Sequence, residues 1–460
     1  MTVPGDRRAE VARTLAEPVP QALSTLDQVG LWGNLGVSLL GFTGAIFVLQ
    51  PGGAGTPVLS LAAGLTATVV GTVLGTLPVA LSALPGTRTG APAMVLLRGL
   101  FGARLSYLPT VLNILQCLGW GIFELVTIAT AAHTVAPALP RWAYIVIAGV
   151  ATGLLTIRPL GAIRVLRKYV TGAVLIVLAY LLISLLLHPL PALSHGTWSG
   201  FWPATDTVVA VAISWAPLAA DYTRHSRTQR AAFTGTLAGY SATQILCYVI
   251  GMLAILTVAR DPNNIFAAFI ALPVGSLGFA ILALRELDQS FANVYSTAAS
   301  TQNLRPLWDR RVLAIAISVI TTVCALVLNI ADYENFLTLL GSVFVPMSAV
   351  LIVDFFLLAR GRWDLSARAP SRWLMLVPWA AGFVTYQLIN PGYVSWWVTA
   401  WSWVAARIGF TPAGWMSASI LSFLVAAAVT GGCGGLAVLV RRRGQARAGQ
   451  AGECLPTGGQ

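Results

Sequence analysis

The chain has 460 residues, of which 57% are hydrophobic and only 10% are charged, and its formal net charge is +12. Soluble domains carry about 25% charged residues, so this composition would leave a soluble protein with an apolar surface. It excludes a soluble enzyme, a nucleic-acid-binding domain and a secreted disulfide-stabilised domain, and it indicates an all-α polytopic membrane protein.

Twelve apolar runs are long enough to cross a bilayer, which takes about 20 residues of helix. The expected spans are roughly 31–49, 56–82, 105–132, 142–158, 169–188, 205–222, 232–258, 265–300, 311–330, 334–359, 373–389 and 417–440. The tryptophan-rich stretch at 396–403 is too short to span. Because indole rings favour the headgroup level, we expect this stretch to lie at the membrane interface.

The basic residues set the expected orientation. With the N-terminus in the cytoplasm, the predicted inner segments hold 24 of the 28 basic residues, and the outer loops hold Arg141, Arg260 and Arg407. This asymmetry follows the positive-inside rule and supports the count of twelve spans. We therefore expect a protein of the cell membrane with both termini in the cytoplasm. The basic clusters lack the interleaved aromatic residues that stack bases, so no nucleic-acid partner is expected.

The first span, 31–49, contains four glycines: Gly33, Gly36, Gly41 and Gly44. Glycine lowers helix stability and lets backbones approach each other closely. Two interpretations are open for this span. It is either a tightly packed helix or an unwound segment whose carbonyl groups hold a cation.

The span 105–132 carries Gln116, Trp120 and Glu124, four residues apart and therefore on one helix face. An amide, an indole and a carboxylate in line are typical of a site for a flat, hydrogen-bonding solute. The alternative is a tryptophan that packs between helices, with Gln116 as an interhelical hydrogen-bond donor. A buried carboxylate one turn away favours the functional interpretation for Glu124.

The span 205–222 contains Ser214 and Trp215 just before Pro217. Proline removes a backbone donor, and a broken helix at membrane depth is tolerated only where it is buried in protein or lines a cavity. A simple proline kink is the equally weighted alternative. Asp221 and Arg224, three residues apart at the cytoplasmic end, predict a structural or gating ion pair.

The span 265–300 concentrates the intramembrane charges, with Arg285, Glu286 and Asp288 followed by Gln289 and Asn293. Ionisable groups in the bilayer mark pathways, pairs or sites. Arg285 and Asp288 are spaced to pair, and Glu286, Gln289 and Asn293 share a face. An extramembrane loop is the less favoured alternative.

The unusual spans recur at an interval of five. The first and sixth are glycine-rich or proline-broken, and the third and eighth carry acids. An odd interval reverses topology, which predicts inverted repeats at 29–188 and 205–359 with a site between them at the membrane midplane. Two further helices would lie at 373–440. Cytoplasmic tails are expected at 1–28 and at 441–460, and the C-terminal tail is expected to be disordered.

Three motifs resemble the nucleobase–cation symporter family, in particular its bacterial cytosine and purine permease branch, over essentially the whole chain. They are Gly119-Trp120 with Glu124, the segment from Ala220 to Arg224, and the segment from Glu286 to Ser296. The resemblance implies a five-plus-five inverted-repeat transporter fold. It also implies a planar base held between aromatic rings, with a cation site nearby.

Carried over to this chain, the resemblance assigns both sites. The implied stacking pair is Trp120 and Trp215, with hydrogen bonds from Gln116, Glu124, Ser214 and Asn293. The implied sodium ligands are carbonyl groups around Gly33 to Val37 and positions Arg285, Asp288 and Gln289.

The sequence departs from the family at the cation site. Asp288-Gln289 stands where sodium-coupled relatives have two hydroxyl residues, and an adjacent arginine is hostile to a cation. An Arg285–Asp288 pair could take the ion's place, or Glu124, Glu286 and Asp288 could carry protons. Protons are therefore slightly favoured over sodium as the coupling ion.

We therefore expect a secondary transporter that imports a nucleobase by alternating access, with the lipid bilayer as its environment. No cofactor other than a coupling H+ or Na+, and no obligatory protein partner, is expected. The alternative within transport is another planar heterocycle, namely a hydantoin, allantoin or a thiamine-type pyrimidine. An embedded enzyme is less favoured because no HExxH or GxSxG motif occurs, and a channel because no filter-like segment repeats.

Overall fold

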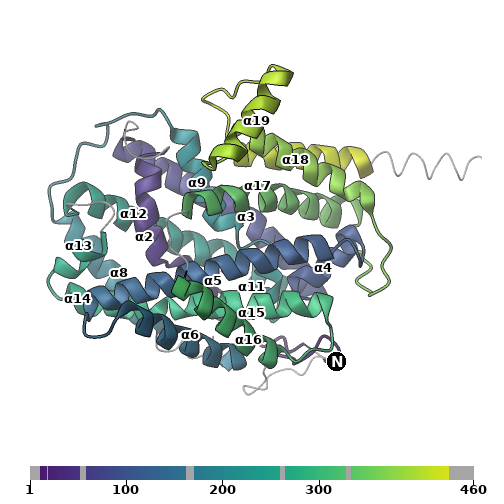
Figure 1. Cartoon of the computed structure of the whole chain (residues 1–460), viewed down its shortest axis with the longest axis horizontal. Helices are drawn as coiled ribbons and strands as arrows, with labels where there is room; N and C mark the ends of the chain where they lie inside the picture. The colour runs from purple at the N-terminus through teal and green to yellow at the C-terminus, as the bar shows by residue number, and fades with distance from the viewer. Residues whose placement is uncertain are drawn as a thin grey trace, which may run out of the picture.

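The computed structural model describes residues 11–17, 19–51, 58–161, 170–259, 265–327 and 333–434. Regular secondary structure in these ranges is helical (Figure 1), apart from two isolated β-bridges that join residues 23 to 226 and 59 to 197. The prediction of a helical chain is confirmed. The predicted disordered tail lies outside the described residues.

Helices occupy parts of all twelve ranges in which the sequence predicts a span. In chain order they are α1 (Thr25–Gly36), α2 (Leu39–Leu49), α3 (Leu61–Thr89), α4 (Ala93–Phe101), α5 (Tyr107–Val135), α6 (Arg141–Ile157), α8 (Thr171–Leu186), α9 (Phe201–Ile213), α10 (Ala219–Thr223), α11 (Gln229–Thr234), the π-helix η2 (Gly235–Tyr240), α12 (Ser241–Thr257), α13 (Ile265–Ala271), α14 (Gly275–Arg285), α15 (Leu287–Leu304), α16 (Arg310–Val327), α17 (Tyr333–Ile352), the π-helix η4 (Val353–Leu358), the short 3-10 helix η5 (Trp373–Met375), α18 (Leu376–Ile389) and α19 (Ser395–Ile408). A final apolar helix covers Ala418–Gly434.

Length and composition qualify five helical segments of the described chain as membrane spans, and a sixth when α1 and α2 count as one bent span. Five further apolar helices have 10 to 17 residues. These helices indicate a chain that crosses the membrane several times. The number of twelve crossings and the inverted repeats at 29–188 and 205–359 stay predictions.

Two spans are interrupted where the sequence shows glycine or proline. The axes of α1 and α2 differ by 57°, and Ser38 caps α2 at the break by accepting a hydrogen bond from the Leu40 amide. The sixth span stops at Ile213 and resumes at Ala219, with Pro217 in the gap. Both breaks lie inside the protein, as backbone groups freed from helical bonds require in a membrane.

The expected single span at 265–300 is corrected to three helices. α13 ends at Ala271, and a tight turn through Pro273 and Val274 leads into α14. Val274 has a positive φ of 56°, which a non-glycine residue adopts in few places other than turns. A second interruption at Glu286 separates α14 from α15, in the middle of the predicted charged segment.

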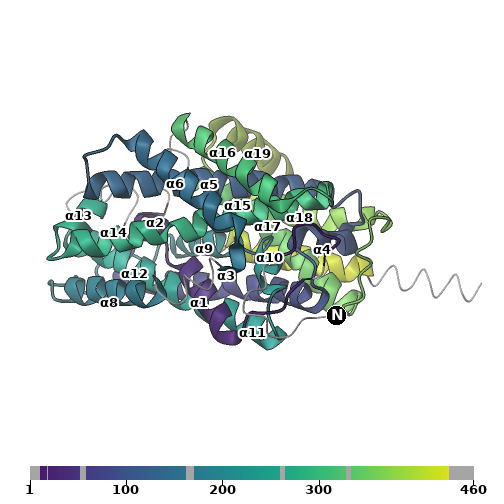
Figure 2. The ribbon, with the colours of Figure 1, turned by 90° about the horizontal axis from the view of Figure 1, so that it is seen from below.

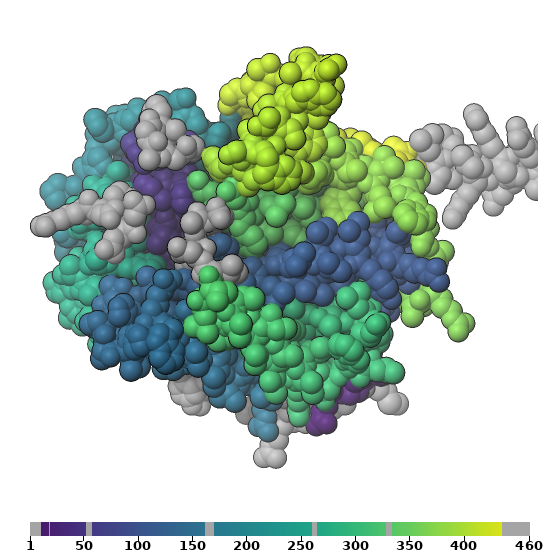
Figure 3. All heavy atoms as spheres, in the orientation of Figure 1, coloured from purple at the N-terminus to yellow at the C-terminus, as the bar shows by residue number. Residues whose placement is uncertain are grey.

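Two helices were not expected from the sequence. All nine residues of α4 are buried, although the helix lies in a predicted cytoplasmic loop. By contrast, α19 has no buried residue, and it stands out from the rest of the molecule in Figures 1 and 3. It contains the tryptophan-rich stretch, whose interfacial location stays a prediction.

The helices form two groups, and the broken first and sixth spans belong to the second of them. α5, α6, α15 and α16 pack together, whereas α3 packs on α9, and α2 on α12. In Figure 2, α5, α6 and α16 lie along one side of the molecule and α8, α12 and α1 along the other. The breaks of the first and sixth spans therefore face the helices that carry Trp120 and Asn293.

The outer face of α16 is apolar, as expected of a helix in contact with lipid. Val312, Ile315, Val319 and Val323 are each at least half exposed and follow a helical period, while Leu313 on the opposite face is buried. An exposed apolar stripe of this kind is unfavourable in water. The helix thus presents a hydrocarbon-compatible face to its surroundings.

The close packing of α1 on η2 leads to a first prediction. A Cβ atom added at Gly36 would lie 2.6 Å from the Tyr240 carbonyl oxygen, too close for any contact, whereas one added at Gly172 meets nothing within 4 Å. We expect Gly36→Ala to lower the free energy of unfolding by about 1–3 kcal/mol, since overpacking forces the backbone to shift. The matched Gly172→Ala change should leave it equal or slightly higher. Thermal unfolding midpoints of the purified variants measure both effects, and equal midpoints would contradict the packing described.

Candidate functional site

A small pocket lies between the two helix groups, where the broken spans meet α5 and α15. Its cavity volume is about 30 Å³, enough for one or two water molecules. The lining residues are Ser38, Leu40, Gly41, Trp120, Glu124, Val211, Ser214, Trp215, Leu218, Tyr240, Gln289 and Asn293. Five of the six predicted substrate-binding residues are therefore brought together here.

The two predicted stacking residues reach this pocket from different elements. Trp120 comes from α5 and packs edge-on against Phe336 of α17, with ring centroids 5.3 Å apart. Trp215 comes from the break in the sixth span and packs edge-on against Trp32 at 6.1 Å and Tyr240 at 6.2 Å. Both indoles are more than nine-tenths buried, so neither faces lipid. Neighbouring aromatic rings thus hold both in place.

Gly119 and Gly121, which flank Trp120, make room for neighbouring helices rather than for a ligand. A Cβ atom at Gly119 would lie 2.6 Å from the Phe336 ring, and one at Gly121 would lie 2.9 Å from Thr321. The two glycines therefore allow α17 and α16 to approach α5 at the level of the indole.

Glu124 places a carboxyl group in the pocket one helical turn from Trp120. The residue is 1% exposed, and its Oε2 atom has no hydrogen-bond partner. A buried carboxyl oxygen without a partner is costly in a packed interior, and a ligand donor would satisfy it.

Gln116 lies behind the pocket and does not line it. Its Nε2 donates to the Ser214 carbonyl oxygen at 2.8 Å and to Asn113 Oδ1 at 3.2 Å. The Ser214 carbonyl group is free to accept because the Leu218 amide donates to Trp215 instead. This geometry corresponds to the alternative of an interhelical hydrogen bond, and it holds the proline break against α5.

Polar groups from the sixth and eighth spans complete the pocket. The Ser214 hydroxyl donates to the Val211 carbonyl oxygen at 2.7 Å, which leaves its lone pairs for the pocket. Asn293 of α15 is 3% exposed and lies two helical turns from Glu286. Both residues are placed where a heterocycle edge could be bound, and their role stays a prediction.

The break in the first span is tied to the eighth span by side-chain hydrogen bonds. The Arg285 guanidinium donates to the Asn34 carbonyl oxygen and, at 2.8 Å, to Glu286 Oε2. Gln289 Nε2 donates to the carbonyl oxygens of Leu35 at 2.7 Å and Val37 at 2.8 Å. The predicted cation region is therefore a dense hydrogen-bonded cluster.

One expectation about this region is corrected. Arg285 pairs with Glu286 rather than with Asp288, because the turn at Glu286 interrupts the helix and brings the adjacent side chains together. The Val37 amide donates to the Asn34 carbonyl oxygen rather than to that of Gly33, so the carbonyl groups from Gly33 to Val37 lie at the break, and their role in holding a cation stays a prediction. Asp288 is buried, and its Oδ2 has no hydrogen-bond partner.

The predicted Asp221–Arg224 ion pair is not formed in this structure. Asp221 Oδ1 instead accepts a hydrogen bond at 2.8 Å from the Ala93 amide, at the N-terminus of α4, where the helix dipole favours an anion. Arg224 donates to the Tyr295 hydroxyl at 3.1 Å and to His225. The two charged groups therefore connect the sixth span to two different elements.

Ser38 and Tyr240 line the pocket without having been predicted as site residues. Ser38 lies at the break of the first span, and its hydroxyl donates to Glu286 Oε1 at 3.1 Å. A serine among the glycines of this span was the available indication. Tyr240 ends a π-helix, which the apolar pattern of the seventh span does not indicate.

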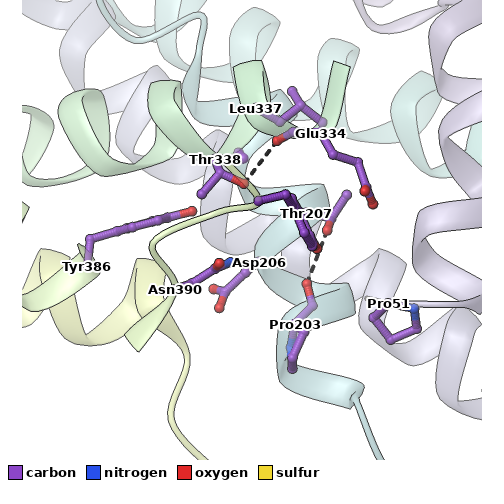
Figure 4. A pocket seen from close by; sticks show the side chains of 11 residues that line it. Pro51, Pro203, Asp206, Thr207, Glu334, Leu337, Thr338, Tyr386 and Asn390 are labelled. Carbon is purple, nitrogen blue, oxygen red and sulfur yellow. Dashed lines mark hydrogen bonds between the residues drawn. The ribbon is translucent and has the colours of Figure 1, made fainter. Parts of the chain in front are cut away.

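A second small pocket lies further along α9 (Figure 4). It is lined by Asp206, Thr207 and Ala210 of α9 and by Glu334, Leu337 and Thr338 of α17. The Asp206 carboxylate accepts hydrogen bonds from Ser417 at 2.5 Å and from the Ala418 amide at 2.8 Å, so it caps the final helix. Val211, adjacent to Ala210, lines the first pocket. The two pockets thus follow each other along one helix.

Within the described residues, no group of three or more His, Cys, Asp or Glu side chains is arranged to hold a metal ion.

Comparison with known proteins identifies the family. Residues 27–372 match the family described as "Permease for cytosine/purines, uracil, thiamine, allantoin". The chain belongs to this family. The permease family accounts for the apolar helices, so the chain is a multi-pass membrane permease and not an enzyme.

Two relatives named as permeases match over part of their length. A putative purine-cytosine permease of Bacillus subtilis is 23% identical over 67% of this chain and 72% of its own length. The purine-cytosine permease fcyB of Emericella nidulans is 25% identical over 59% of this chain. The match spans 59% of that fungal relative.

Solved structures show the fold of this permease. One of them is Mhp1, described as a nucleobase-cation-symport-1 family transporter and solved in a closed conformation with bromovinylhydantoin bound. Its TM-score is 0.68 at 18% sequence identity, and the match covers 93% of this chain and 95% of the Mhp1 chain. A Na+-coupled sialic acid symporter has a TM-score of 0.57 at 13% identity over 94% of this chain and 93% of its own. The chain therefore has the transporter fold of these proteins.

Proposed function

We propose that this permease is a secondary transporter that imports a nucleobase, such as cytosine or a purine, by alternating access. The observation that carries the proposal is that Trp120 and Trp215, from different helix groups, line one buried pocket. Stacking on an aromatic ring contributes about 1–3 kcal/mol per base and tolerates any flat ring. The polar groups of Glu124 and Asn293 would select among rings by their edges, because unmatched polar groups in a dry site are unfavourable.

We infer coupling to a cation gradient, with protons favoured over sodium. Glu124, Glu286 and Asp288 are all at most 2% exposed, at membrane depth in the predicted topology. Glu124 Oε2 and Asp288 Oδ2 have no hydrogen-bond partner, so each of these carboxyl groups has an oxygen at which a proton could bind. Glu124 also lines the pocket, which would connect protonation to substrate binding.

In alternating access, the two breaks would be the hinge points at which one helix group moves relative to the other. The breaks separate half-helices at residues 37–38 and 214–218, and both border the pocket. One inverted repeat at 29–188 would move against the other at 205–359 around the bound base. The cell membrane, with both termini in the cytoplasm, follows from the arginine distribution.

Uptake of labelled cytosine, hypoxanthine and other purines into proteoliposomes tests the proposal. We expect accumulation of at least one base under an inward pH gradient, and none in protein-free vesicles. If neither a pH gradient nor a sodium gradient drives uptake of any base, the coupled-transport proposal fails.

A second class of solute is supported by the family description, which includes thiamine and allantoin besides nucleobases. Two indole rings that line one pocket would accept a hydantoin, allantoin or a thiamine-type pyrimidine equally well. A thermal-shift screen of the purified permease separates these from nucleobases. The solute with the largest saturable stabilisation identifies the class, because binding to the folded state alone raises the unfolding midpoint.

A further inference from the structure

The break in the first span exposes backbone carbonyl groups at the C-terminal end of α1. Leu35 O lacks its helical partner because the Leu39 amide donates to Glu286 instead, and Val37 O lacks its own because the Gly41 amide donates to Ser38 O. Carbonyl groups freed in this way, at the negative end of a half-helix, are where broken-helix transporters coordinate a cation. The same oxygens form the cation region that the family resemblance implies.

In this chain, two side chains of the eighth span donate to carbonyl oxygens at this end of α1, including both freed oxygens. Gln289 Nε2 is bonded to both Leu35 O and Val37 O, and the Arg285 guanidinium is bonded to Asn34 O. Arg285 is 1% exposed, so its charge lies inside the protein beside the carbonyl groups. The positive charge that the half-helix end favours is thus part of the polypeptide.

The carboxylate of Glu286 completes the arrangement on the other side of the break. Its Oε1 accepts from the Leu39 amide at 3.0 Å and from the Ser38 hydroxyl at 3.1 Å, at the positive N-terminal end of α2. Its Oε2 accepts from Arg285 at 2.8 Å. Each half-helix end therefore meets a side chain of opposite charge, and the pair as a whole is neutral.

These residues do not fit a bound sodium ion. A sodium ion at the break would need oxygen lone pairs that now accept hydrogen bonds from an amide and a guanidinium group. It would also lie next to a fixed positive charge in a poorly screened interior, where like charges repel strongly. The family's cation region is therefore chemically different in this chain.

We propose that the Arg285 guanidinium, held by Glu286 and assisted by Gln289, takes the place of a coupling sodium ion at the break between α1 and α2. The break is held against the eighth span by the hydrogen bonds of these three side chains. The permease then neither binds sodium at this site nor requires it for transport.

Sodium binding to the full-length wild-type protein is the first test, and it does not depend on the identity of the substrate. The unfolding midpoint of the purified permease is measured in sodium, potassium and choline chloride at equal ionic strength. We expect no difference between the three salts. A saturable stabilisation specific to sodium would overturn the proposal, because a ligand that binds only the folded state must raise the midpoint.

Arg285→Ala together with Gln289→Ser tests whether the break between α1 and α2 is the position at which the side chains replace sodium. This double variant frees the carbonyl oxygens and supplies a hydroxyl, so we expect a sodium-specific rise of the midpoint that wild type lacks. Arg310→Ala is the matched control, because Arg310 is equally buried and donates to the Thr156 carbonyl oxygen outside the break. It should lower the midpoint without any sodium response. A folded double variant whose midpoint does not change with sodium would contradict the assignment of the sodium position to this break.

The transport consequence rests on the proposed function and is tested separately. At a fixed pH gradient and membrane voltage, initial uptake should change by less than about twofold when external sodium is replaced by choline, the change expected without thermodynamic coupling. Uptake that requires sodium overturns the inference. If no solute is transported at all, the proposed function fails, while the midpoint measurements still decide whether sodium binds.

If the double variant does not fold, Arg285→Lys replaces it. A lysine keeps a positive charge at the break but cannot reproduce the forked contacts of arginine. We expect it to stay insensitive to sodium, with a lower midpoint than wild type. A sodium-stabilised Arg285→Lys variant would show that the fixed charge does not exclude the ion.

Discussion

Replacing Trp120 by alanine is expected to weaken the binding of a base by about 5- to 150-fold, which corresponds to the 1–3 kcal/mol of one stacking contact. The ring lies on one side of the pocket and is held against Phe336, so nothing else on α5 can replace it. Trp215→Ala should have an effect of similar size, because its indole lines the same pocket. Equilibrium binding of the solute that emerges from the thermal-shift screen measures both.

Trp308→Ala is the control for these changes, because Trp308 is 53% exposed and does not line the pocket. Its affinity should equal that of wild type. Trp120→Phe keeps a flat face and should lose less affinity than Trp120→Ala. Unchanged affinity in both alanine variants would mean that the base does not stack on these indoles.

Glu286→Ala is expected to destabilise the protein by about 3–5 kcal/mol, because it leaves the buried Arg285 guanidinium without its counter-charge. The same change removes the acceptor for the Leu39 amide at the start of α2. Asp364→Ala, at an exposed position, should have almost no effect. Unfolding midpoints compare the two variants.

A compensating change makes this prediction more specific. Replacing a buried pair by apolar residues is often neutral, whereas removing one partner is not. Arg285→Met in the Glu286→Ala background should therefore recover part of the lost stability. If Glu286→Ala alone unfolds at the wild-type midpoint, the buried Arg285–Glu286 pair does not stabilise the contact between the first-span break and the eighth span.

The sequence was sufficient where a local pattern determines the structure. The four-residue spacing of Trp120 and Glu124 puts both on one face of α5, and both line the pocket. Pro217 predicts the break in the sixth span, because a proline removes a helical donor whatever surrounds it. Periodicity and proline chemistry act within a few residues, so they can be recognised without a fold.

The sequence was insufficient where a partner comes from another element. Asp221 and Arg224 are spaced to pair, yet Asp221 binds the Ala93 amide because α4 is brought against it. Arg285 has two candidate partners close in sequence, and the interruption at Glu286 decides between them. α4 has only nine residues, too few to be recognised as a separate element before the packing is known.

A structure of the permease with its tightest-binding planar solute tests the central claim most directly. The account predicts that the ring lies between Trp120 and Trp215, with its polar edge against Glu124 and Asn293. A ring bound instead in the pocket beside Asp206 and Glu334 (Figure 4), or in contact with neither indole, would contradict it.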